Sequence, residues 1–184
     1  APDVYQGSPV SITAFMAVVV KTAAFGSFLR IMSMGFGEVS FAWSGFLWTL
    51  SVLSMTIGNL MACRQRSIKR MLAYSSIAHS GYALMGFLAL GSSRGAEAVA
   101  FYLLAYTFMT IASFGVVLIV TAGTDAQYDK DDLDSLAGIG WTNPLLAFVM
   151  SVAILSLAGI PPLGGFMGKF YLFSSAIRSG YIGL

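Results

Sequence analysis

The sequence predicts an all-α protein that lies within a membrane. Hydrophobic residues make up 57% of the 184 residues and charged residues only 10%, whereas charged residues are about a quarter of an ordinary globular chain. The long apolar stretches reach about twenty residues, which is the length a helix needs to cross a bilayer. They are continuous and do not alternate between polar and apolar residues, so a β-barrel is disfavoured.

We predict five membrane segments, each an apolar stretch bounded by polar or turn-forming residues. Glu97 opens the fourth, where the helix dipole favours a carboxylate, and the capping-type residues Thr142 and Asn143 precede Pro144 at the start of the fifth. The predicted segments are residues 10–33, 43–64, 68–91, 95–121 and 144–180.

The fifth segment is too long for one straight helix across a bilayer core about 30 Å thick. A run of glycines and prolines interrupts it, and proline cannot continue a helix without losing a backbone hydrogen bond. We therefore predict a break at 160–165, between half-helices at 144–159 and 166–180. The residues that carry the break are Gly159, Pro161, Pro162, Gly164 and Gly165.

The orientation follows from the short connection 64–70, which is rich in arginine and lysine. The positive-inside rule places such a connection on the cytoplasmic side or its organellar equivalent. Counting crossings places the 122–143 loop on that same side and the connections 34–42 and 91–95 on the other. We expect a multi-pass protein of a bacterial inner membrane, with an organellar membrane as the alternative. The basic residues near span ends are expected to snorkel or to set topology: Arg30, Lys69, Arg70, Arg94 and Arg178.

The 122–143 loop is acidic. Aspartates at alternate positions can bind calcium, but the glycine and the closing glutamate of an EF-hand are absent. We predict no metal site here, and instead a solvated loop with a short amphipathic helix near 131–138. The aspartates in question are Asp125, Asp129, Asp131, Asp132 and Asp134.

Three titratable residues interrupt the apolar stretches: Lys21 in the first, His79 in the third, and Lys169 about one turn after the break. A lysine at the centre of a membrane helix costs about 2.5 to 3.5 kcal/mol on insertion scales, so a partner or water must compensate. Broken helices line polar cavities in many transporters. The three residues are therefore candidates for a proton relay. Fixed structural ion pairs, or a lysine bonded to the carbonyls of the broken helix, are the alternative.

Helical spacing places Ser75, His79 and Tyr82 on one face of the third segment. Imidazole has two nitrogens and can pass a proton from one side to the other, although a histidine bonded to Ser or Tyr across helices is the structural alternative. In the fourth segment Tyr102, Tyr106 and Thr110 also share a face and could bond water. Tyr106 is included as a supporting polar group, while tyrosines near span ends more often anchor a helix at the interface.

The composition argues against redox centres within this chain. Its one cysteine, Cys63, and its one histidine exclude an internal disulfide, a cysteine-built iron-sulfur or zinc site and a bis-histidine haem. The net charge of +2 is too small to indicate nucleic-acid binding. The chain opens with Ala1 instead of methionine and shows no signal sequence, so we expect an internal piece of a longer protein.

Four stretches resemble the antiporter-like N subunit of proton-pumping NADH:quinone oxidoreductase, respiratory complex I, and its counterpart in the chloroplast NDH complex. The stretches are Ala1–Pro9, Ser54–Leu60, Ile68–Tyr82 and Leu155–Tyr171. They span nearly the whole chain. The first and third together distinguish the N type from related cation/proton antiporter subunits.

The resemblance implies an antiporter-like helical bundle built on two inverted repeats, each with a broken helix. It makes Lys21 the central connecting lysine, Lys169 the broken-helix lysine, and His79 the polar residue between them. NADH, flavin, iron-sulfur clusters and quinone would be handled by other subunits, and this chain would bind none of them. The implied partners are the other membrane subunits of the complex, lipids, protons and water. The alternatives are an Mrp-type cation/proton antiporter subunit without redox coupling and a structural membrane scaffold.

Overall fold

The computed structural model describes residues 2–36, 40–90, 94–122 and 132–181, and these residues are almost entirely helical. Strand pairing among them is limited to an isolated bridge between Ser67 and Asp132. The longer helices are α3 (Lys21–Gly35), α4 (Ser40–Ala62), α5 (Ile68–Phe87), α6 (Gly95–Ala122), α8 (Pro144–Ala158) and α9 (Gly164–Arg178). The shorter ones are α1 (Pro2–Gly7), α2 (Val10–Phe15), α7 (Ile139–Thr142), a π-helix (Met16–Val20) and a 3-10 helix (Leu133–Leu136).

The first predicted segment is one continuous rod made of α2, the π-helix and α3, from Val10 to Gly35. The wider π-turn at Met16–Val20 shifts the register of the side chains that follow it, and such turns occur often at functional sites. Lys21 is the first residue after this turn. The π-turn therefore helps to set the direction in which the Lys21 side chain leaves the helix.

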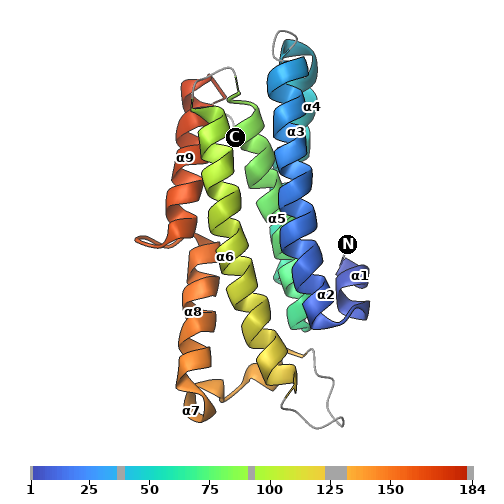
Figure 1. Cartoon of the computed structure of the whole chain (residues 1–184), viewed down its shortest axis with the longest axis vertical. Coiled ribbons are helices and arrows are strands. Elements are labelled where there is room, and N and C mark those ends of the chain that lie inside the picture. The colour runs from blue at the N-terminus through green and yellow to red at the C-terminus, as the bar shows by residue number, and fades with distance from the viewer. Residues whose placement is uncertain (1, 37–39, 91–93, 123–131, 182–184) are drawn as a thin grey trace.

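Helix α5 packs against α1, α3, α4, α6 and α9, and in Figure 1 it lies behind and between α3 and α6. Its closest neighbour is α4, because glycines let the two backbones approach. A Cβ on Gly58 would lie 2.7 Å from the Ala78 nitrogen, and one on Gly81 would lie 2.8 Å from the Ser51 carbonyl oxygen. Contacts on so many sides shield the polar residues of α5.

Among the described residues, three helices are long and apolar enough to cross a membrane: Val10–Gly35, Ala42–Ala62 and Gly95–Ala122. Helix α8 is apolar but shorter. Helix α5 has the length of a span but carries Lys69, Arg70 and His79, which lower its hydropathy. Because α5 is surrounded by other helices, its polar side chains face protein. That residues 68–91 and 144–180 cross the membrane remains a prediction.

Helices α8 and α9 are stacked end to end beside α6, with the break between them (Figure 1). The break spans 159–163, slightly earlier in the chain than the predicted 160–165, because α8 ends at Ala158 and α9 already begins at Gly164. Gly159 ends α8 in the left-handed conformation, with φ 87°, which glycine adopts without steric cost. Gly164 and Gly165 belong to the first turn of α9, where the absence of a side chain at Gly165 allows close packing on α8.

The expectation that Lys69 snorkels at a span end is wrong. This side chain is only 6% exposed, and its Nζ donates to the carbonyl oxygens of Gln6 and Ser8, at 3.1 and 3.3 Å. The neighbouring Arg70 pairs with Asp3 at 3.1 Å. Lysine satisfies carbonyls at the C-terminal end of α1, where a cation is favoured. The two residues therefore attach α1 to the start of α5.

The connection 64–70 and the segment that starts at residue 132 lie at the same end of the bundle. The Leu133 amide donates to the Arg66 carbonyl at 2.9 Å, next to the bridge between Ser67 and Asp132. In place of the amphipathic helix expected near 131–138, this segment forms a 3-10 turn at Leu133–Leu136. Asp125, Asp129 and Asp131, which the sequence places in the acidic loop, lie outside the described residues.

Candidate functional site

The polar middle of α5 lies between two clusters of buried apolar side chains. One cluster includes Ile68 and Leu72 at the start of α5, and the other includes Ala83 and Phe87 near its end. Ser76 and His79 fall between them, and they are 8% and 5% exposed. A polar layer sealed on both sides by apolar packing is partly dehydrated, which strengthens electrostatic interactions within it.

Lys21 reaches this layer from the start of α3. Its Nζ donates to the Ser76 hydroxyl at 2.8 Å and also to the Ser76 carbonyl oxygen. A longer contact of 3.4 Å reaches the Tyr106 hydroxyl, and Nζ lies 4.5 Å from the centroid of the Tyr106 ring. Helical spacing points to Ser75, but the serine that holds Lys21 is its neighbour, Ser76. Lys21 comes from α3, so the periodicity of α5 alone does not show whether Ser75 or Ser76 contacts it.

His79 is enclosed by three tyrosines. Its Nδ1 lies 2.5 Å from the Tyr102 hydroxyl, and which of the two donates depends on the tautomer of the imidazole. The ring centroids of Tyr106 and Tyr82 lie 5.2 and 5.8 Å from that of His79. Tyr106 thus contacts both Lys21 and His79.

Tyr102 is a functional candidate that was not among the residues chosen from the sequence. Interpreting it as an interfacial anchor is wrong, because the residue is only 1% exposed and its hydroxyl meets His79. The available signal is the spacing of Tyr102, Tyr106 and Thr110 on one face of α6, all three of which are buried. The sequence does not show which helix packs against that face.

Lys169 approaches from the other side, one turn into α9. Its Nζ donates to the carbonyl oxygens of Leu157 and Ala158, at 2.8 and 3.1 Å. Those carbonyls are at the end of α8, where the break leaves them without helical partners. The same Nζ lies 4.7 Å from the centroid of the Tyr82 ring. Lys169 therefore caps α8 and also faces the tyrosine that contacts His79.

The break itself is fixed by backbone contacts around Gly165. Its amide donates to the Ser156 hydroxyl at 3.0 Å, and a Cβ at this position would lie 1.8 Å from the Ser156 carbonyl oxygen. Pro161 and Pro162 are exposed in the short linker between the half-helices. The ends of α8 and α9 are thus held together, with Lys169 one turn away.

The structure brings the three predicted titratable residues into one row of contacts. The row runs Lys21, Tyr106, His79, Tyr82, Lys169. Within the described part of the chain, neither lysine forms an ion pair with a carboxylate, and no cluster of three metal-ligating side chains occurs. The arrangement holds two amines, an imidazole and phenols close together, all of which can accept or donate protons.

Fold and site together define a helical membrane protein with a broken helix and buried titratable groups at its centre, features typical of ion and proton transporters. The model of the family described as "NADH:quinone oxidoreductase/Mrp antiporter, TM" matches residues 1–184, and the chain belongs to this family. It is 50% identical over 183 residues to NADH-quinone oxidoreductase subunit N of Trichlorobacter lovleyi, covering 100% of this chain and 37% of that protein. The resemblance to subunit N is thereby confirmed.

Two solved structures of membrane complexes contain chains with the same fold. A chain of respiratory complex I from Thermus thermophilus with bound aureothin is 42% identical, with a TM-score of 0.80 over 99% of this chain and 38% of that one. A chain of the Mrp complex from a Dietzia species is 28% identical, with a TM-score of 0.86 over 97% and 32%. The predicted all-α, antiporter-like membrane fold is confirmed. The chain spans a little over a third of the subunit N relative, 37% of its length.

Proposed function

We propose that this chain is part of a membrane subunit that moves protons across the membrane, within a complex that couples this movement to NADH:quinone electron transfer. The observation that carries the proposal is the row from Lys21 through Tyr106, His79 and Tyr82 to Lys169. The chain is 50% identical to an NADH-quinone oxidoreductase subunit N. This similarity supports the coupling of proton movement to electron transfer.

In this proposal protons pass between the lysines by way of His79. Imidazole accepts a proton on one nitrogen and releases one from the other, and the Tyr102 hydroxyl at Nδ1 orients the ring. A rotation of the ring or a bridging water completes the step to Tyr106 or Tyr82, since these rings touch His79 without a hydrogen bond. Like charges repel strongly in a partly dehydrated layer, so protonation of one lysine favours release from the other.

Electron transfer takes place elsewhere in this proposal. NADH, flavin, iron-sulfur clusters and quinone are bound by other subunits, and the chain contributes no redox centre. Its partners are the neighbouring membrane subunits. The membrane is the inner membrane of a bacterial cell, with residues 64–70 and 122–143 on the cytoplasmic side, as the basic connection between α4 and α5 supports.

The test is to replace Lys21 or Lys169 by alanine in the assembled complex and to measure NADH-driven proton pumping in vesicles together with NADH oxidation. We expect pumping per NADH to fall at least about a hundredfold, the lower end of the range for loss of a proton-transfer group. Lys130→Ala, in the polar loop of the sequence, is the matched control and leaves pumping unchanged. Wild-type pumping in both variants favours a structural scaffold, in which Lys169 only caps α8.

A second candidate is a cation/proton antiporter subunit without redox coupling. The observation in its favour is the likeness to the Mrp complex chain, with a TM-score of 0.86, although the identity there is only 28%. The two candidates are separated by transport measured on the full-length protein in vesicles without NADH or quinone. Sodium-dependent proton movement under these conditions identifies the antiporter, and its absence favours the redox-coupled complex.

A further inference from the structure

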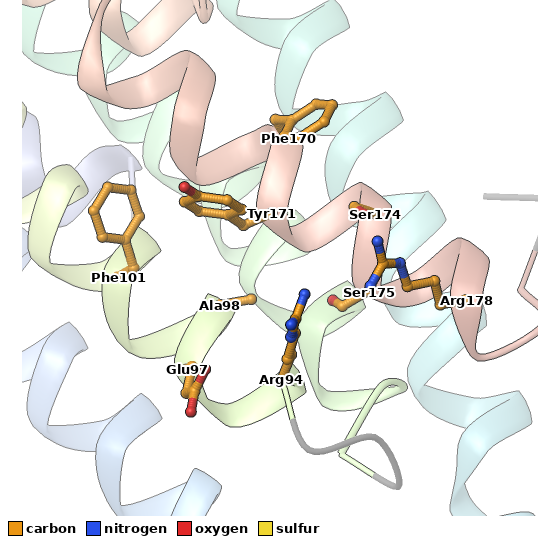
Figure 2. A pocket seen from close by; sticks show the side chains of 9 residues that line it. All are labelled: Arg94, Glu97, Ala98, Phe101, Phe170, Tyr171, Ser174, Ser175 and Arg178. Carbon is orange, nitrogen blue, oxygen red and sulfur yellow. The ribbon is translucent and has the colours of Figure 1, made fainter.

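A cavity of about 600 Å³ lies between the beginning of α6 and the second half of α9 (Figure 2). It is separate from the row of titratable residues and plays no part in the proposed proton path. Two arginines contribute to its lining: Arg94, just before α6, and Arg178, at the end of α9.

The arginines give the cavity an unbalanced positive charge. Neither guanidinium forms a hydrogen bond or ion pair with another residue in the part of the chain that the structure describes. Figure 2 shows both side chains directed toward the space between the two helices, whereas the Glu97 carboxylate, also part of the lining, points away from it. A pair of guanidinium groups that share one space favours an anion with several oxygens, such as a phosphate.

Deeper in the cavity the lining becomes aromatic. Phe101, Phe170 and Tyr171 lie seven or eight residues along their helices from the arginines, which is about 10 Å at the rise of an α-helix. Phe101 and Tyr171 meet edge to face at 5.4 Å, and Phe170 is 54% exposed. The cavity is thus basic at the ends of the helices and apolar toward the middle of the bundle.

The change from a basic to an apolar lining along the cavity matches the change from headgroups to acyl chains across one leaflet of a bilayer. The ends of membrane helices lie at the level of the lipid headgroups, and residues about 10 Å further along lie among the acyl chains. A soluble anion would contact only the two arginines, and the exposed aromatic rings would then have no ligand to pack against. A neighbouring protein helix would have to supply carboxylates for both guanidinium groups.

We propose that this cavity binds one acidic phospholipid, whose phosphate lies between Arg94 and Arg178 and whose acyl chain packs on Phe101, Phe170 and Tyr171. Ser174, which also lines the cavity between the arginine and aromatic parts, is placed to donate a hydrogen bond to the headgroup. The lipid would fill the groove between α6 and α9 at the end of the bundle opposite the 64–70 connection.

The test uses the complete complex in phosphatidylcholine nanodiscs that contain a small fraction of phosphatidylglycerol with a photoreactive acyl chain. After illumination, peptides of this chain are analysed for attached lipid. We expect labelling near Phe101 and within Phe170–Tyr171, and competition by unlabelled phosphatidylglycerol. The double variant Arg94→Gln, Arg178→Gln loses about tenfold or more of the labelling, because it lacks both guanidinium groups that pair with the phosphate. Arg30→Gln, an arginine near the end of α3, is the matched control and leaves labelling unchanged.

Four results would overturn the proposal. Equal labelling by photoreactive phosphatidylcholine would mean that the arginines do not select the headgroup. Competition by millimolar inorganic phosphate would assign the site to a soluble anion. Crosslinks from these peptides to another protein segment, in place of lipid, would show that the cavity is a protein interface. Labelling that persists in the double variant, with the complex assembled normally, would contradict the assignment of the two arginines.

Discussion

At the scale of single residues, the central feature is the contact of His79 with Tyr102. Both side chains are buried, and their polar atoms satisfy one another at 2.5 Å. A buried polar atom without a partner costs about 1 to 3 kcal/mol, so the pair is mutually dependent. The contact also holds the plane of the imidazole, which decides where a proton can leave.

We expect Tyr102→Phe to slow NADH-driven proton pumping in the assembled complex roughly tenfold, because the imidazole loses the hydroxyl that orients it. The substitution leaves the buried Nδ1 of His79 without this partner, at a cost of about 1 to 3 kcal/mol. This is less than the stability of a typical folded domain, about 5 to 15 kcal/mol, so the subunit should still assemble. The measurement is the pumping rate per NADH oxidised, with the amount of assembled subunit as the reference.

Tyr74→Phe is the matched control for this substitution. Tyr74 lies on the same helix as His79, and its hydroxyl has no hydrogen bond with any residue that the structure describes. Pumping should stay at the wild-type rate in this variant. A wild-type rate in Tyr102→Phe as well would mean that the hydroxyl is not needed for proton movement.

At the scale of helices, the break between α8 and α9 is a packed junction with its polar groups satisfied. Lys169 bonds the last carbonyls of α8, and Ser156 accepts from the Gly165 amide. The two glycines at the start of α9 have different roles. A Cβ on Gly165 would overlap the backbone of α8, whereas one on Gly164 would meet nothing within 4 Å.

We therefore expect Gly165→Ala to destabilise the protein by about 3 kcal/mol or more, because backbone atoms cannot move aside as a flexible side chain can. Gly164→Ala, the matched control, should change stability by no more than about 1 kcal/mol. The temperature at which half of the purified full-length protein aggregates measures the difference. Equal temperatures for the two variants would show that the junction is loosely packed.

At the scale of the whole molecule, the described helices place both the 64–70 connection and the segment from residue 132 at one end of the bundle. The hydrogen bond from Leu133 to Arg66 joins them. Cys63, next to this connection, is exposed. It can therefore report which side of the membrane this end faces.

We expect a membrane-impermeant maleimide to label Cys63 in inverted vesicles and not in right-side-out vesicles, because the basic connection beside it is retained on the cytoplasmic side. Mass spectrometry of the labelled peptide is the measurement. The Cys63→Ser variant, which lacks the thiol, shows the background. Labelling confined to right-side-out vesicles would reverse the orientation.

The sequence by itself determined the fold class, the helix break and the positions of Lys21, His79 and Lys169. Charges within apolar stretches and a double proline are costly in a membrane, so they stand out without any partner being known. Only the tertiary structure decided which groups meet these residues. Ser76 instead of Ser75, Tyr102 at His79 and the buried Lys69 all depend on contacts between helices that are distant in sequence. Helical periodicity gives the face of a side chain but not the neighbour that covers it, and the neighbour decides the chemistry.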